Sequence, residues 1–299
     1  MSGAGGIIVD MTDERYSRLA AEHLPSDLAE RWIALLRPCV RLRRADAGEQ
    51  VVAVLGGVPE LPSGVDWPDW PEVGPLSFIA SVRCAALPAA GRAAGVPGDG
   101  TLLFFYFDGR GEDAGDDESA FVSVYDPQTW VGARVLYVPE GTPVSPVEPP
   151  CGPAPYPRVE LAADVEQSAP DLWLPQVREA LLGSGDPWPE PREIPVGLRP
   201  FRRAFAKLDG RIGHRVGGHA VPIQGPVEYE AASADLGVER PWGEPQLDAE
   251  ATRWLLLAQF DSDEDAGMEW GDAGTLYWLI RSEDLADRRF DRARLVAQC

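Results

Sequence analysis

The residues with the clearest chemical potential form an acidic loop in the last fifth of the sequence. Residues 261–272 carry six carboxylates in 12 positions, with no basic residue among them. Calcium and magnesium are bound by oxygen ligands, and alternate acidic positions on a turning loop can converge on one ion. One interpretation is therefore a Ca²⁺ or Mg²⁺ site, formed by Asp261, Asp263 and Asp272, that activates water for hydrolysis. The other is a structural loop, whose aspartates accept hydrogen bonds from nearby backbone N–H groups.

Several aromatic, imidazole and amide side chains could bind a ligand without reacting with it. Trp67 and Trp70 belong to a Trp-Pro-Asp-Trp-Pro run that could present aromatic faces to a proline-rich or sugar ligand. In the alternative interpretation, each indole covers the apolar base of a loop. We take as candidate ligand-binding residues Trp67, Trp70, His214, His219, Gln224 and Trp270.

Two further patterns do not match common catalytic sites. His214 and His219 are five residues apart, and in a strand this spacing places them on opposite faces, away from a shared ion. The pairs Gly56-Gly57 and Gly217-Gly218 match neither G-x-G-x-x-G nor G-x-x-x-x-G-K-[ST]. They favour bulges or close backbone approaches at strand ends. We assign no catalytic residue, and no cofactor beyond the Ca²⁺ or Mg²⁺ of the first interpretation.

The composition restricts the partners. The 299 residues include 27 basic and 48 acidic ones, which gives a net charge of −21. A negative field repels nucleic acids and anionic membranes, so we expect neither as a partner, and a basic protein or a small molecule remains. The four cysteines show no C-x-x-C pair and predict reduced, mostly buried thiols. Without a recognisable signal peptide or membrane-spanning segment, we expect a cytoplasmic protein.

The elements that position these residues begin with a helical segment, residues 1–45. Residues 12–37 predict two helices, ended by Pro38, which form a hairpin packed against the sheet that follows. Residues 46–158 predict a first β-rich repeat, in which 101–107 forms a strand buried on both faces. The predicted strands of this repeat are 51–55, 76–82, 101–108, 120–125 and 133–138.

Proline-rich segments divide the rest of the chain. Eight prolines in residues 139–157 predict an extended surface connection without a helix. Residues 159–200 predict a short helix that ends at Gly183, then a second proline-rich connection. Residues 201–299 predict a second β-rich repeat, whose clearest strands are 254–260 and 275–280. The predicted whole is one compact unit with two lobes.

The two β-rich segments repeat the same order of features. In each segment a glycine pair comes first and is followed by an apolar strand. A Gly-Thr-Leu sequence comes next, at Gly100 in the first segment and at Gly274 in the second. A constant order with nearly constant spacing indicates a duplicated unit. The sequence therefore predicts an internally duplicated α+β fold, with mixed or antiparallel sheets and an N-terminal helical hairpin.

Three motifs resemble those of the YwqG-like proteins, a bacterial family of uncharacterised function. The first runs from Leu55 to Pro68 (LGGVPELPSGVDWP), and the second comprises residues 214–218 with Pro222 and Gln224. The third comprises residues 261–263, residues 270–274 and Asp284-Leu285. Together they extend over roughly residues 51–299. The resemblance implies a duplicated α+β fold and no particular reaction.

Three functional hypotheses follow from the sequence. The first is a non-catalytic binding protein that sequesters a basic protein or a small ligand, which the acidic charge and the tryptophan-rich loops favour. The second is a hydrolase that depends on a divalent metal ion in the loop 261–272. The third is a structural or housekeeping module, whose motifs serve only folding.

Overall fold

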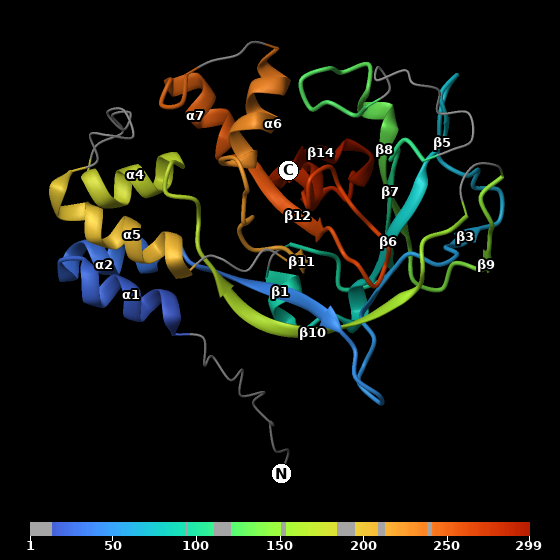
Figure 1. Cartoon of the computed structure of the whole chain (residues 1–299), viewed down its shortest axis with the longest axis horizontal. Coiled ribbons are helices and arrows are strands. Elements are labelled where there is room, and N and C mark those ends of the chain that lie inside the picture. The colour runs from blue at the N-terminus through green and yellow to red at the C-terminus, as the bar shows by residue number, and fades with distance from the viewer. Residues whose placement is uncertain are drawn as a thin grey trace.

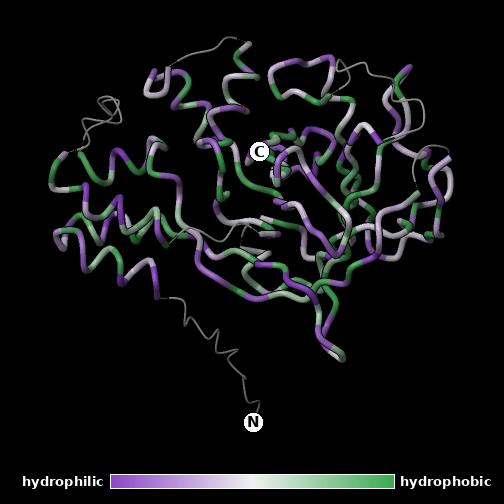
Figure 2. Tube along the Cα trace, viewed as in Figure 1, coloured by the Kyte–Doolittle hydropathy of each residue, from purple (hydrophilic) through white to green (hydrophobic). Residues whose placement is uncertain are grey.

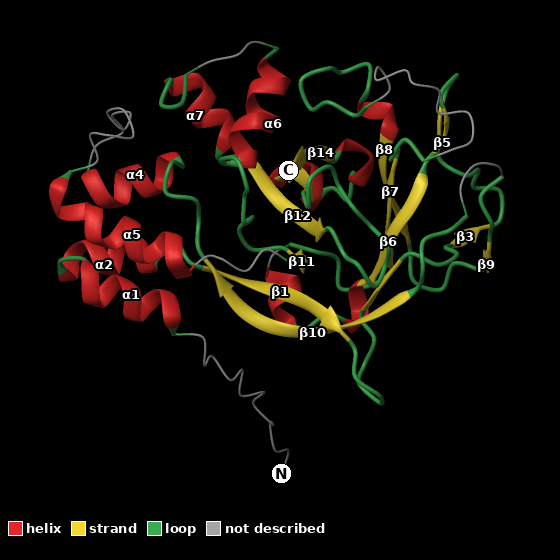
Figure 3. Cartoon of the chain, in the orientation of Figure 1, coloured by secondary structure: helices red, strands yellow, loops and turns green. Residues whose placement is uncertain are grey.

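The protein is a mixed α+β structure built around one ten-stranded antiparallel sheet (Figures 1 and 3). The computed structural model describes residues 14–93, 95–110, 121–150, 154–183, 195–208, 213–237 and 241–299. The sheet curves into a nearly closed, barrel-like shape. Its strand order is β14-β13-β12-β11-β1-β10-β2-β6-β7-β8.

The strands of the large sheet come from both halves of the chain. One end of the sheet is built from β2 (Ala53–Leu55), β6 (Ser77–Arg83), β7 (Thr101–Tyr106) and β8 (Ala133–Val138). The other end is built from β11 (Arg215–Val216), β12 (Trp254–Asp261), β13 (Thr275–Arg281) and β14 (Arg294–Gln298). Two small sheets accompany the first end: β3 (Glu60–Pro62) with β9 (Val144–Pro146), and β4 (Asp69–Trp70) with β5 (Gly74–Pro75).

The two central strands were not predicted. β1 (Arg37–Arg44) lies in the segment predicted as helical, and β10 (Val159–Ser168) lies in the segment predicted as helix and connection. They pair over their whole common length, from Arg37 opposite Ser168 to Arg44 opposite Leu161. Arginines of β1 pair with acids of β10, as in the 3.2 Å contact from Arg41 to Glu166. Because these charged residues interrupt the apolar ones, the sequence of neither segment was interpreted as a strand.

The strand order is mirrored about the central pair β1 and β10. β2 and β11 stand next to the centre, and a glycine pair with positive φ follows each of them. Gly56 N–H donates to the Ile79 carbonyl at 2.9 Å, and Gly217 N–H donates to the Leu257 carbonyl at 3.2 Å. Both acceptors lie at a register shift of their strand. Of the two predictions for the glycine pairs, the close backbone approach is confirmed, since a Cβ on Gly56 would lie 2.4 Å from the Pro157 carbonyl oxygen and one on Gly218 2.5 Å from Cys39 Cβ. The bulges lie on the neighbouring strands β6 and β12, and the duplication itself stays a prediction.

Helices form a separate layer beside the sheet, at the left of Figure 1. The predicted hairpin packs mainly against other helices rather than against the sheet that follows: Trp32 is fully buried against Phe201 and Phe205. Hydrophilic and hydrophobic residues alternate along this layer (Figure 2). Its helices are α1 (Arg15–His23), α2 (Ser26–Ile33), α4 (Pro175–Leu182), which ends at Gly183 as predicted, and α5 (Arg199–Leu208).

The second half is less β-rich than predicted, because α5 and three more helices lie in it. α6 (Val227–Leu236) and α7 (Pro245–Ala251) precede β12, and α8 (Ser282–Ala286) follows β13. α6 contacts β12, β13 and β14. The short helix α3 (Ala89–Ala93) lies in the first half. Turns of 3-10 helix complete the described elements, at Cys84–Ala86, Trp130–Gly132, Val196–Leu198 and Phe290–Arg292.

Other predictions for the loops have mixed outcomes. Residues 121–125 form turns rather than a strand, although Val122 and Val124 are buried. The proline-rich connection has no helix over its described residues, 139–150 and 154–157. Cys39 and Cys84 are buried free thiols, Cys299 is exposed, and Cys151 lies outside the described residues. Among the helices described, none is long and apolar enough to cross a membrane.

The inner face of the curved sheet forms the main core, where side chains from both ends of the sheet meet. Phe104 of β7 packs edge-to-face against Phe260 of β12 and Trp278 of β13, with ring centroids 5.1 and 5.2 Å apart. All three are buried, at 1% exposure or less. Burial of such large aromatic surfaces stabilises the closed curvature of the sheet.

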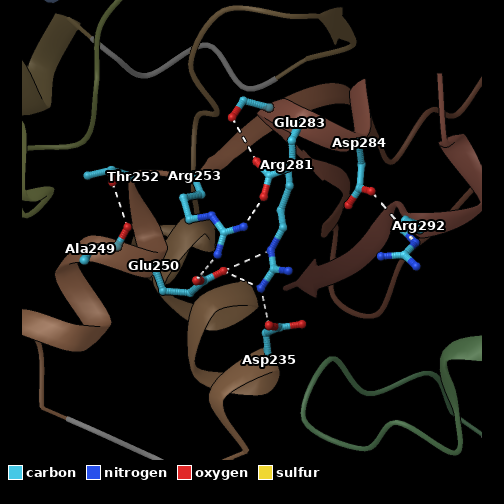
Figure 4. Close-up of polar contacts among 10 residues, drawn as sticks. Asp235, Ala249, Glu250, Thr252, Arg253, Arg281, Glu283, Asp284 and Arg292 are labelled. Carbon is cyan, nitrogen blue, oxygen red and sulfur yellow. Dashed lines mark hydrogen bonds and ion pairs between the residues drawn. The ribbon is translucent and has the colours of Figure 1, made fainter. Parts of the chain in front are cut away.

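Charged residues hold α6 and α7 onto the second end of the sheet (Figure 4). Glu250 of α7 accepts hydrogen bonds from Arg281 of β13 at 2.6 and 3.0 Å, and from Arg253 at 2.8 Å. Arg281 also pairs with Asp235 of α6, and Arg253 pairs with Glu283 of α8. The alternating charges therefore link three helices to β13 and to Arg253, the residue before β12.

Candidate functional site

A groove of about 920 Å³ crosses the outer face of the first end of the sheet. Antiparallel register places side chains of neighbouring strands on one face, and Ser81 lies opposite both Val54 and Leu103. The floor combines four buried apolar side chains with two hydroxyl groups that are partly exposed. They are Val54, Phe78, Leu103 and Val138, with Ser81 and Thr101.

Charged side chains form the rim of the groove. All five are exposed: Glu60, Arg83, Glu140, Arg158 and Glu160. Arg158 and Glu160 pair with each other at 2.9 Å. Arg83 donates to the backbone carbonyl of Val51. Glu140 accepts an N–H from Gly100 at 3.4 Å, and Glu60 has no ion-pair partner in the described part of the chain.

The groove is open because none of the described helices covers this end of the sheet. At the other end, the corresponding outer face carries Leu256, Tyr277, Leu279 and Val296, which are buried together with residues of α6 and α7. On the first end, β3 and β9 cover only part of the face, where Leu61 packs with Phe78 and Leu103. The remaining face combines an apolar floor with a polar rim, as ligand-binding clefts commonly do.

A smaller pocket of about 20 Å³, room for roughly one water molecule, adjoins the groove at Gly57 and Phe78. It is lined by Trp67, Arg110 and Tyr156. The Arg110 guanidinium lies over the Tyr156 ring, 3.4 Å from its centroid, and its Nε donates to Asp108 at 3.0 Å.

The Tyr156 hydroxyl donates to the same Asp108 carboxylate at 2.7 Å. Burial and the neighbouring Asp108 carboxylate raise the pKa of Tyr156, which keeps the hydroxyl protonated. These contacts hold one wall of the pocket rigid.

All three candidate tryptophans pack against other residues, and they differ in how deeply they are buried. Trp67 is half-buried, donates its indole N–H to the Leu76 carbonyl at 2.9 Å, and reaches the small pocket. Trp70 is half-buried against Phe107. Trp270 is buried between Tyr106 and Tyr156. Trp67 lines the small pocket, and its covering role agrees with the second interpretation of the sequence.

The acidic loop joins β12 to β13, as predicted, and is held by His214. The His214 Nδ1 accepts the Asp261 N–H at 3.1 Å, so its proton is on Nε2, which donates to Asp263 at 3.1 Å. This hydrogen bond lowers the pKa of Asp263. Asp261 Oδ1 accepts from Thr275 and from Ser262 N–H, and Asp263 Oδ1 accepts from Ala266 N–H.

These contacts agree with the structural interpretation of the loop. In the part of the chain that the structure describes, no group of three or more His, Cys, Asp or Glu side chains is placed to hold a metal ion. Asp261, Asp263 and Asp272 therefore do not form the predicted three-carboxylate group. Binding of Ca²⁺ or Mg²⁺ by the loop in some other arrangement stays a prediction.

The two remaining candidates have structural partners far from the groove. His219 is buried, and its Nε2 donates to the Leu35 carbonyl at 2.9 Å. Burial lowers the pKa of His219 to about 3. The Gln224 N–H donates to Gln298 at 3.0 Å. His214 and His219 contact different parts of the fold, so they do not share a site.

The sequence-based prediction missed the residues that line the groove. Ser81 and Arg83 alternate with buried residues along β6, and Thr101 begins β7. Polar residues at alternate positions of an apolar strand were the available signal, since they mark one accessible face. The rim residues Glu60, Glu140 and Glu160 meet only through the strand topology, which no local pattern reports.

Comparison with known proteins identifies one family. The family model described as "Domain of unknown function (DUF1963)" matches residues 53–299. This range includes the small pocket, the acidic loop and all the residues that line the groove except Val51. Among curated proteins, none matches the chain.

Proposed function

The chain belongs to the DUF1963 family, the YwqG-like proteins of unknown function, and we propose that it is a non-catalytic binding protein whose ligand occupies the groove on β2, β6, β7 and β8. The observation that carries this proposal is the volume of the groove, about 920 Å³. This is the upper part of the range found for sites of drug-sized ligands, roughly 300–1,000 Å³.

The chemistry of the lining supports binding rather than reaction. The lining as a whole exposes more apolar than polar surface, and the hydroxyls of Ser81 and Thr101 can hydrogen-bond to a ligand and orient it. Among the described residues of the lining there is no histidine and no cysteine. These residues offer no nucleophile paired with a base, the arrangement that covalent catalysis requires.

The mirrored strand order is a second argument for a ligand on the open outer face of the first end of the sheet. We propose that the two ends of the sheet derive from a duplicated unit, a relationship supported by the equivalent glycine pairs and register shifts. In the second unit α6 and α7 cover the outer face. In the first unit the same face is open. Helices thus cover the outer face of one unit, and the equivalent face of the other unit is accessible to a ligand.

The proposal places the protein in the cytoplasm. The buried free thiols of Cys39 and Cys84 support a reducing compartment. The metal-dependent hydrolase receives no support from the geometry of the acidic loop, since His214 and Thr275 already occupy carboxylate oxygens of Asp263 and Asp261.

A capture experiment with a blocked groove tests the proposed function. The Ser81→Trp variant puts an indole on the floor, whereas Ser26→Trp puts one on the exposed start of α2. Protein recovered from its native cells is examined by native mass spectrometry for a bound molecule. We expect the wild type and Ser26→Trp to retain the molecule and Ser81→Trp to lose it. Equal retention by both variants contradicts the proposal.

A further inference from the structure

We infer that the ligand of the groove is an extended segment of a basic protein, whose cationic side chains pair with Glu60 and Glu140. The inference rests on the proposed function and specifies the class of ligand. It depends on three observations: the unpaired carboxylates of the rim, the size and lining of the floor, and the charge of the whole chain.

The carboxylates of the rim are the first observation. Arg158 and Glu160 neutralise each other at 2.9 Å. Glu60 and Glu140 have no cationic partner in the described part of the chain, and Glu140 accepts only a 3.4 Å N–H from Gly100. Both carboxylates line the same groove, Glu60 from β3 and Glu140 from the turn that follows β8, so cationic side chains of a bound segment can reach them. Arg83 adds one positive charge, which leaves the unpaired part of the rim with net negative charge.

The size and lining of the floor are the second observation. Free cations and polyamines offer little apolar surface, whereas the lining of the groove exposes more apolar than polar surface. An extended peptide alternates side chains between its two faces, so that apolar ones can lie on the floor of the groove while others point to the rim. Ser81, Thr101 and the Arg83 guanidinium can hydrogen-bond to peptide amides and carbonyls.

The overall charge is the third observation. A chain with a net charge of −21 attracts basic proteins and repels nucleic acids and acidic peptides over distances beyond contact. Such fields mainly raise association rates, whereas the contacts in the groove determine how slowly the bound partner dissociates. The structure therefore combines a general attraction for basic partners with one place where an extended segment fits.

Fluorescence anisotropy with a defined peptide tests the inference. The probe is a labelled hexapeptide of alternating alanine and arginine, and its counterpart carries glutamate in place of arginine. We expect binding of the arginine peptide alone, weakened by salt because exposed charges are screened. The double variant Glu60→Gln/Glu140→Gln should lose about tenfold in affinity, since each exposed ion pair contributes only modestly. Ser81→Trp should abolish binding.

A charge-matched control separates the rim from the general field. Glu22 and Glu30 are exposed on α1 and α2, and Glu22→Gln/Glu30→Gln changes the net charge equally. We expect this variant to bind the peptide like the wild type. Equal loss in both double variants overturns the inference, as does displacement of the peptide by an equal concentration of spermidine, which would indicate a site for small cations.

The two proposals fail separately. In one outcome, native mass spectrometry shows a molecule that the Ser81→Trp variant loses, while the arginine peptide does not bind. In that case the groove is a ligand site, and the inference that its ligand is a basic segment is wrong. If neither probe depends on Ser81, both proposals are wrong.

Discussion

Ser81 of β6 lies opposite Leu103 of β7, and both side chains face the groove. The adjacent register pair, Ala80 and Phe104, faces the inner core instead. One strand pair thus separates the core that closes the sheet from the surface proposed to bind a ligand. A substitution at Ser81 is therefore expected to affect the groove more than the core.

The glycine pairs should be the backbone positions least tolerant of a side chain. A Cβ on Gly56 would lie 2.4 Å from the Pro157 carbonyl oxygen, and one on Gly218 would lie 2.5 Å from Cys39 Cβ. Gly48 shares the positive φ but has open space around it. We expect Gly48→Ala to cost about 1 kcal/mol of unfolding free energy, and Gly56→Ala and Gly218→Ala about 3 kcal/mol or more. Urea denaturation measures all three, and equal losses would contradict the close approaches.

His219 should make the protein less stable as the pH falls. The native pKa of His219 is about 3, below the unfolded value of roughly 6.5. Below pH 6.5 the unfolded chain therefore binds a proton that the native state does not. The resulting loss of stability amounts to about 2 kcal/mol between pH 6.5 and pH 5.

Denaturation of His219→Gln at both pH values checks this contribution. The variant retains an amide donor for the Leu35 carbonyl and removes the titration, so its pH dependence should be smaller by that amount. His23→Gln, whose side chain is not buried, is the control and should follow the wild type. An unchanged slope in His219→Gln would show that another group is responsible.

The acidic loop should behave as a structural element. His214 donates to Asp263 and lowers its pKa, so this carboxylate stabilises the protein above its unfolded pKa, near 4, and the contribution is lost as the pH falls through the lower native value. Asp263→Asn should cost about 1–3 kcal/mol at pH 7. Asp261→Asn should also destabilise, because the charged acceptor of Thr275 and Ser262 is lost.

Thermal melts with chelator and with millimolar Ca²⁺ or Mg²⁺ test the alternative. We expect the Tm of the wild type to be independent of either ion. A Tm that rises with metal concentration, and does so less in Asp263→Asn, would instead favour a cation site.

The charge network of Figure 4 should stabilise the helical cover of the second end of the sheet. Glu250 is 10% exposed and accepts from Arg253 and Arg281. Glu250→Gln should cost about 3 kcal/mol, because two arginines lose a largely buried partner. Glu22→Gln, at an exposed site, should change the unfolding free energy by less than about 0.5 kcal/mol. Similar small effects in both variants would assign the attachment of α7 to apolar packing alone.

The strands predicted correctly are those with continuous apolar residues. Most residues of β7, β12 and β13 are buried, so their sequences contain few polar interruptions. β1 and β10 are equally central in the sheet but alternate apolar residues with arginines and acids that pair across the strands. A local pattern treats those charges as signs of helix or loop, although they are satisfied between two distant segments.

The acidic loop could be predicted from local sequence, whereas the groove could not. The loop is contiguous, so its position between two strands and its backbone-bonding aspartates could be predicted. Its contact with His214, 49 residues away, could not. The groove brings Val54, Ser81, Thr101 and Val138 together through strand order alone. Its location therefore required the fold.

Photo-crosslinking from the rim of the groove tests the central claim most directly. A photoreactive benzoylphenylalanine replaces Thr142, which lines the groove, or Ser26, which lies on α2, and the protein is irradiated in its native cells. We predict an adduct from position 142 that is absent from position 26 and disappears when Ser81→Trp is added. No adduct from position 142, or the same adduct from both positions, would contradict a ligand in the groove.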